Sequence, residues 1–192
     1  YREYLGEYLH QRQRPEEALA AWKEIAAGDR RTKDNLLRVS EVLQGFGYLE
    51  PALDFMREAC KLNPEPGERL KFAELLRSDG PEHSIEQALQ QLDLAEQSAS
   101  TSDERQQILT ERIKTLIVAG QLAEQTNRLA AELNARNDAT AERWRTLALY
   151  QDAGDRLNEA TTSAAKVVEL EPQSISGWSI LADLSERTGR LG

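Results

Sequence analysis

Apolar residues recur at steps of three and four positions along the whole chain, which is the spacing of one face of an α-helix. Alternation of apolar and polar positions, which is typical of strands, is absent. Turn residues divide the pattern into eleven segments, so the sequence predicts an all-α fold. The expected helices cover residues 1–13, 15–27, 33–45, 49–62, 67–78, 82–98, 102–118, 121–135, 139–153, 157–170 and 174–188.

Prolines, glycines and short polar residues predict where these helices begin and end. Pro15 and Pro51 fit helix starts because the first turn does not use the N–H that proline lacks, while Pro64 and Pro172 follow helix ends. Four glycines are expected in the turns between paired helices: Gly47, Gly120, Gly154 and Gly189. Side-chain acceptors for helix starts are expected at Ser102-Asp103 and in residues 137–140.

The chain is similar to itself at a period of 34 to 37 residues. Trp144-x-x-Leu147-Ala148 is followed 34 positions later by Trp178-x-x-Leu181-Ala182. Such a period predicts stacked helical hairpins, each of which buries its apolar face against its neighbour. The small-residue position of the second helix recurs at Ala18, Ala52, Ala88, Gln125 and Ala160.

This pattern resembles the tetratricopeptide repeat, a helix–turn–helix of 34 residues. Residues 33–66 carry it at Leu36, Val39, Ser40, Leu43, Gly47, Ala52, Met56, Ala59 and Pro64. Residues 141–174 carry it at Trp144, Leu147, Ala148, Gly154, Ala160, Ala164, Val167 and Pro172. Residues 1–32 show Leu5-Gly6, Ala18 and Trp22, and residues 175–192 show only the first half, with Trp178, Leu181, Ala182 and Gly189.

The resemblance implies a right-handed α-solenoid of stacked antiparallel helix pairs that forms a single array over residues 1–192. Its repeats would be 1–32, 33–66, 67–101, 102–138, 139–174 and a partial 175–192. We expect Trp22, Trp144 and Trp178 to fill the space opposite the alanines, and a further helix to cover Trp178, Leu181 and Leu184. The middle of the array departs from the pattern, with a longer turn at 79–87 and with Gln125 and Glu132 at positions that are normally small.

Charge and composition exclude several classes of function. The net charge is −9, from 33 acidic and 24 basic side chains, and no basic cluster is present that would bind a nucleic acid. No apolar run approaches the roughly 18 residues of a membrane-spanning helix. The single cysteine, Cys60, cannot form an intramolecular disulfide, which slightly favours the cytoplasm over a bacterial periplasm.

No constellation of residues resembles an active site, a metal site or a cofactor site, so we expect a protein that is not an enzyme and holds no cofactor. His10 and His83 are the only histidines, and neither has a ligand partner at a suitable spacing. Cys60 is expected to be a small buried hydrophobe. Tyr1, Tyr4, Leu5 and Tyr8 form a helical stripe, for which packing against a preceding repeat is favoured over contact with a partner.

In proteins with this resemblance, ligands lie in a groove lined by the first helix of each pair. The candidate groove residues in this chain are Asp34, Arg38, Glu41, Glu68, Lys71, Phe72, Gln107, Lys114, Glu142, Arg145 and Leu149. The alternative is that they form a solvated face. One variant of the family captures a C-terminal carboxylate with Lys and Asn. Lys71 and Arg145 take the basic position here, but Leu75 and Leu149 take the Asn position, so that clamp is incomplete.

The resemblance implies a non-catalytic scaffold or adaptor segment that binds a peptide or a folded protein in the groove. Charge reversal of Arg38 and Arg145 together is expected to weaken such binding. Two alternatives remain: a module for homo-oligomerisation, and the regulatory arm of an enzyme whose catalytic domain lies outside this chain. An RNA-binding helical repeat is disfavoured by the net charge of −9.

Overall fold

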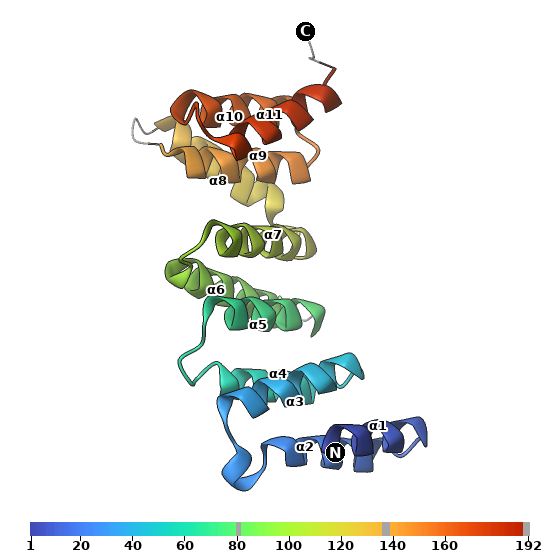
Figure 1. The fold of residues 1–192 in the computed structure, drawn as a ribbon. Coiled ribbons are helices and arrows are strands. Elements are labelled where there is room, and N and C mark those ends of the chain that lie inside the picture. Colours follow the sequence, from blue (N-terminus) through green and yellow to red (C-terminus); the bar gives the residue numbers. More distant parts are fainter. Residues whose placement is uncertain (80–81, 136–138, 190–192) are drawn as a thin grey trace. The chain divides into compact units, whose positions relative to one another are not determined.

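The computed structural model describes residues 1–79, 82–135 and 139–189, and every α-helix in these ranges falls on a segment that the apolar pattern predicts (Figure 1). The α-helices are α1 (Arg2–Gln11), α2 (Pro15–Lys23), α3 (Lys33–Gly45), α4 (Leu49–Ala59), α5 (Pro66–Asp79), α6 (Glu82–Ser98), α7 (Ser102–Val118), α8 (Leu122–Ala135), α9 (Ala141–Ala153), α10 (Leu157–Leu170) and α11 (Ile175–Arg187). Two short 3₁₀ helices, η1 (Glu24–Ala26) and η2 (Gly28–Arg30), follow α2. The fold is all-α.

The helices group into two compact units, Tyr1–Thr115 and Leu116–Gly192, and each is described by itself. Unit 1 holds the antiparallel pairs α1/α2, α3/α4 and α5/α6, followed by most of α7. Figure 1 shows these pairs stacked in chain order within the unit. Unit 2 holds α8, the pair α9/α10, and α11 against α10.

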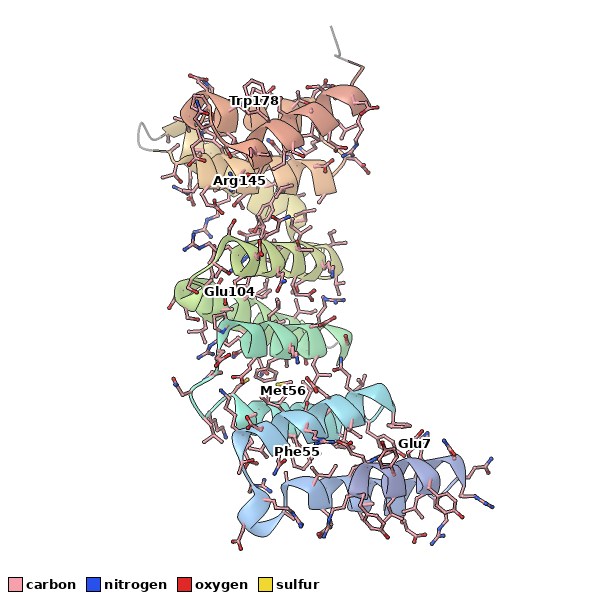
Figure 2. All side chains as sticks on the ribbon, viewed as in Figure 1. Glu7, Phe55, Met56, Glu104, Arg145 and Trp178 are labelled. Carbon is pink, nitrogen blue, oxygen red and sulfur yellow. The ribbon has the colours of Figure 1, made fainter. Side chains whose placement is uncertain are left out.

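The core of unit 1 is built where its helices approach through small residues. Ala18, Ala52 and Ala88, the recurring small positions of the second helices, are all completely buried. Large side chains fill the space between the pairs, among them Trp22, Leu36, Leu43, Met56, Leu76 and Leu92. Met56 is labelled on α4 in Figure 2. Each such side chain contributes about 1.5–3 kcal/mol by leaving water.

In unit 2 the core forms around Ala148, Ala160, Ala164 and Leu184. Leu184 is already buried by its own unit, and the further helix expected over Trp178, Leu181 and Leu184 stays a prediction. Trp178 is 53% exposed on α11, and its indole N–H donates to the carbonyl of Pro172 at 2.9 Å. Trp178 therefore does not fill an interior space as the completely buried Trp22 does.

Short side chains begin several helices. Thr32, Thr140 and Ser174 accept hydrogen bonds from backbone N–H groups in the first turns of α3, α9 and α11. For α7 the prediction named Ser102-Asp103, but the acceptor is Thr101, which bonds the N–H of Glu104 at 3.1 Å. The Glu104 carboxylate accepts in return from the Thr101 N–H at 3.0 Å. This reciprocal arrangement is a capping box. Asn137 and Asp138, also named as acceptors, lie outside the described residues.

The turns between paired helices need a residue with positive φ. Gly47 and Gly120 supply it, with φ of 81° and 67°, because glycine has no Cβ to oppose that conformation. Between α9 and α10 the residue with positive φ is Asp155 at 58°, one position after Gly154. Residues 82–87, expected within a longer turn, already belong to α6.

The irregular positions of α8 are accommodated by polar contacts. Gln125 is half-buried, whereas its counterpart Ala160 in α10 is completely buried. The Glu132 carboxylate accepts from Arg143 on α9 at 2.7 Å and from Arg128 at 3.2 Å. An ion pair thus joins α8 to α9 at a position that is otherwise small.

Candidate functional site

His10 and Cys60, which are residue types that often serve in catalytic or metal sites, pack against neighbouring side chains in this protein. The His10 ring lies 5.1 Å from that of Phe46, and its Nδ1 is 3.1 Å from the Tyr48 hydroxyl. Cys60 is half-buried, and burial raises the pKa of its thiol to about 11. The side chain of His83 lies outside the described residues. Within the described ranges, no three His, Cys, Asp or Glu side chains are placed to hold a metal ion. No described helix is both long enough and apolar enough to cross a membrane.

The predicted groove residues fall in both units. Eight lie in unit 1 and three, Glu142, Arg145 and Leu149, lie in unit 2. In unit 1 we use the term first-helix surface for the polar side chains that α1, α3, α5 and α7 place around their mutual contacts. Its members are Glu3, Lys33, Arg38, Glu41, Glu68, Lys71, Glu74, Gln106, Gln107, Thr110, Glu111 and Lys114.

Most charges of this surface are bonded to one another across neighbouring repeats. Arg38 on α3 donates to Glu3 on α1, with Nη2 2.7 Å from Oε2. Lys71 on α5 donates to Glu41 on α3. These partners lie 35 and 30 residues apart, so each pair joins the first helices of two neighbouring repeats. Pairs this exposed contribute about 0–1 kcal/mol each, so their main effect is to neutralise the surface locally.

Glu68 has a structural role at the start of α5. Its carboxylate accepts from the backbone N–H of Glu65 at 2.8 Å and lies 2.8 Å from Lys33 Nζ on α3. The first contact caps the helix and the second joins two repeats. Asp34, by contrast, is exposed in the first turn of α3, where a negative charge favours the helix dipole.

Phe72 does not face a groove, and that prediction was wrong. Its side chain is 5% exposed and belongs to the core of unit 1, together with Ala73, Leu75 and Leu76. Successive residues of an α-helix are rotated by about 100°. An error of one position in the register therefore moves a side chain from the surface to the core.

The most enclosed ionic contact of unit 1 lies between α5 and α7. Arg77 Nε donates to Glu111 Oε1 at 2.5 Å, and Lys114 Nζ lies 3.4 Å from the other carboxylate oxygen. The Glu111 side chain is only 6% exposed, whereas that of Lys114 is 55% exposed. Arg77 is thus the main partner of this buried carboxylate, and Lys114 is a loosely held second one.

A hollow of about 410 Å³ opens beside this contact, between α5 and α7. It is lined by Leu70, Glu74, Gln106, Gln107, Thr110, Glu111 and Lys114. The sequence had indicated Gln107 and Lys114 but not Glu74 or Thr110. Glu74 follows the predicted Lys71 by three positions and Thr110 precedes Lys114 by four, so helical spacing was the signal that could have found both.

A second hollow, of about 300 Å³, lies at the start of unit 1 between α1 and α3. Its lining is Tyr1, Arg2, Glu3, Ile25, Arg30, Asn35 and Arg38. Each arginine has an acidic partner: Arg2 and Arg30 lie 2.5 and 3.5 Å from Glu24, and Arg38 bonds Glu3. The cations of this hollow are therefore already compensated within the protein.

In unit 2, Arg145 is held by the neighbouring repeat. Its guanidinium donates to Glu142 at 3.1 Å and to the Ser174 hydroxyl at 3.2 Å, at the start of α11. Glu171 lies 3.8 Å away. Figure 2 labels Arg145 on α9. Leu149 is half-buried beside the buried Ala148 and Tyr150. Arg145 thus links α9 to α11.

Comparison with known proteins finds similarity among solved structures. No protein-family model matches the chain, and no curated protein matches it either. The chain is similar to the C-terminal part of a TPR repeat-containing protein from Cytophaga hutchinsonii, with 14% identity, 97% of this chain and 71% of that chain covered, and a TM-score of 0.50. It is similar to a putative kinesin light chain from Podospora anserina with nearly identical TPR-like repeats, with 14% identity, coverage of 88% and 93%, and a TM-score of 0.51. A TPR protein from Thermus thermophilus shares 22% identity over 95% and 96% of the two chains, with a TM-score of 0.45.

Proposed function

We propose that this chain, whose fold is that of the tetratricopeptide repeat proteins, is a non-catalytic scaffold that binds an extended peptide segment of another protein on the first-helix surface of unit 1. The hollow between α5 and α7 is the centre of the proposed contact. The proposed contact includes only some of the candidate groove residues that the sequence indicated. It leaves out Phe72, which is buried, and the residues of unit 2.

The observation that carries the proposal is the polar lining of that hollow. Gln106, Gln107 and Glu74 line it with exposed side chains that have no hydrogen-bond or ion-pair partner among the described residues. A glutamine amide both donates and accepts, as a peptide backbone does. Free amides beside an open hollow therefore suit an extended chain, whose backbone groups need partners.

A second candidate function is self-assembly, which the exposed stripe on α1 favours. Tyr1, Tyr4 and Tyr8 are 95%, 75% and 52% exposed, and Leu5 beside them is also exposed. Aromatic residues gathered on one exposed helix face are typical of contact sites. Sedimentation of the protein with Tyr4→Ser/Tyr8→Ser as the matched variant tests this: a mass that rises with concentration only in the wild type supports it.

The proposed binding is tested by site-specific photo-crosslinking. A photoreactive phenylalanine analogue replaces Gln107 in one variant and the exposed Glu124 on α8 in the control. The proposal expects a protein that crosslinks at position 107 and not at 124. Crosslinking of the same proteins at both positions, or at neither, would contradict it. This test avoids charge reversal of Arg38, which would bring a new carboxylate against Glu3 and disturb an internal pair.

A further inference from the structure

Most basic side chains of the first-helix surface form ion pairs with acidic side chains of the same surface. Arg38 is bonded to Glu3, Lys71 to Glu41, and Lys33 lies 2.8 Å from Glu68. These basic side chains are the ones that an acidic partner would need. The charge that a partner meets on this surface therefore depends on the carboxylates that have no internal partner.

Of the carboxylates of the first-helix surface, Glu74 is the one without a cationic partner among the described residues. It lies in the middle of α5, away from the helix start where a negative charge would favour the dipole. Its helical neighbours three positions away on either side are Lys71 and Arg77. Lys71 bonds Glu41 on α3, and Arg77 bonds Glu111 on α7. Both cations that could neutralise Glu74 within its helix are thus bonded to other repeats.

Glu111, on the opposite wall of the hollow, has a partner that a ligand can replace. Its Oε1 is bonded to Arg77, while its Oε2 faces Lys114 Nζ at 3.4 Å, beyond ordinary hydrogen-bond length. The Lys114 side chain is 55% exposed and loses little by turning into solvent. Lys114 therefore stands where the cationic group of a ligand would lie.

We propose that the hollow between α5 and α7 receives the side chain of an arginine or lysine from the bound segment, which pairs with Glu74 and displaces Lys114 from Glu111. This inference rests on the proposed function and names the chemistry of its partner, a basic polypeptide segment. Gln106 and Gln107 bond the backbone that flanks the basic residue. Leu70 contacts the aliphatic stem, which packs on apolar surface while its charged end stays polar.

Charge complementarity favours this occupant over an acidic one. An acidic side chain in the hollow would meet the uncompensated charge of Glu74 and would find Lys71 and Arg77 already bonded. The protein as a whole carries a net charge of −9, which attracts basic segments at long range.

The experiment uses two labelled peptides that differ in one charge. Each is an acetylated, amidated, alanine-rich extended peptide with a central arginine or, in the control, a citrulline, which has nearly the same shape but no charge. Binding to the full chain is followed by fluorescence anisotropy. We expect the arginine peptide to bind about 10-fold more tightly, the effect of one charge-assisted hydrogen bond.

Variants of the chain locate the effect. Glu74→Gln is expected to reduce the preference for arginine to below about 3-fold, whereas Glu124→Gln, the same charge change on α8, leaves it intact. Lys114→Gln is expected to tighten the arginine peptide several-fold, and Lys23→Gln on α2 is its matched control. All four positions are solvent-exposed, so the urea midpoints are expected to stay close to that of the wild type.

Equal binding of the arginine and citrulline peptides would overturn the inference. So would equal losses in Glu74→Gln and Glu124→Gln, which would indicate attraction by net charge alone. If free argininamide displaced the labelled peptide with an inhibition constant equal to the Kd of the peptide, the site would bind a small cation and not a polypeptide. In each case the proposed function would still hold if proteins continued to crosslink at position 107. Loss of that crosslinking would contradict both the proposed function and this inference.

Discussion

Gly6 on α1 lies directly against the indole of Trp22 on α2: a Cβ on Gly6 would be 2.5 Å from Trp22 Cδ1. Trp22 is completely buried, and its Nε1 donates to the carbonyl of Glu3 at 3.2 Å. Its ring stacks on Phe46 of the next repeat, with centroids 4.6 Å apart. The absence of a side chain at Gly6 therefore fixes how α1 packs on α2 and where the first repeat meets the second.

Gly6→Ala is expected to destabilise the protein by about 1–3 kcal/mol, the range for overpacking a tight core. The methyl group has no space to enter, because the indole is held by its hydrogen bond and by the stacked ring. The measurement is a urea unfolding curve read by circular dichroism. A midpoint equal to that of the wild type would show that α1 shifts freely, contrary to this packing.

Gly45→Ala is the matched control for that substitution. Gly45 is the last residue of α3, and a methyl group placed on its Cα would meet no other atom within 4 Å. Its φ is not positive, so alanine fits the backbone and restricts the unfolded chain. We expect Gly45→Ala to be neutral or to stabilise the protein by about 0.4–1 kcal/mol.

The sequence was sufficient for the helices and for the small positions between them. Helical spacing of apolar residues depends only on local geometry, and Ala18, Ala52 and Ala160 are completely buried as their repetition predicted. The resemblance to tetratricopeptide repeats, drawn from the same residues, agrees with the similarity to solved structures.

The surface could be predicted only in part. Whether Arg38 is free or bonded depends on its distance from Glu3, which lies 35 residues away and is set by how two repeats stack. Phe72 was placed on the surface by an error of one helical position. Trp178 has the same sequence context as the half-buried Trp144, yet it is exposed, because burial depends on the neighbouring helices and not on the side chain's own pattern.

The Glu104 cap is expected to make stability depend on pH. Hydrogen bonds from the backbone N–H groups of Thr101 and Ser100 lower the pKa of the Glu104 carboxyl in the folded state. A carboxyl whose pKa is lower in the folded state stabilises the folded protein at pH values above its unfolded pKa of about 4.3. This stabilisation is lost as the pH falls through the pKa of the folded state. Glu104→Gln should therefore differ most from the wild type near neutral pH and least in acid.

The check is a set of urea midpoints for both proteins between about pH 7 and pH 3. Glu124 is an exposed glutamate in the first turn of α8, and Glu124→Gln serves as the control for loss of one charge. A difference between wild type and Glu104→Gln that stays constant over this range would contradict the cap. Figure 2 labels Glu104 at the start of α7.

The Cys60 thiol is expected to react slowly while the protein is folded. Burial raises its pKa to about 11, so only a small fraction is thiolate near pH 8, and the thiolate is the reactive form. The rate of reaction with Ellman's reagent should rise steadily as pH approaches that value. In urea the rate near pH 8 should increase to that of a free cysteine. A folded rate equal to the unfolded one would show an accessible thiol with an ordinary pKa.

Arg77 and Glu111 should be strongly coupled, and Lys71 and Glu41 weakly. The first pair has side chains only 21% and 6% exposed, against 58% and 51% for the second. Removing Arg77 leaves the Glu111 charge buried with only Lys114 near it, which costs up to about 3–5 kcal/mol. Arg77→Met/Glu111→Gln should recover part of that loss, because no uncompensated charge remains. Double-mutant cycles from urea unfolding should therefore give a coupling above about 1.5 kcal/mol for the first pair and below about 1 kcal/mol for the second. Equal couplings would mean that water screens both pairs alike and that Glu111 is not enclosed between α5 and α7.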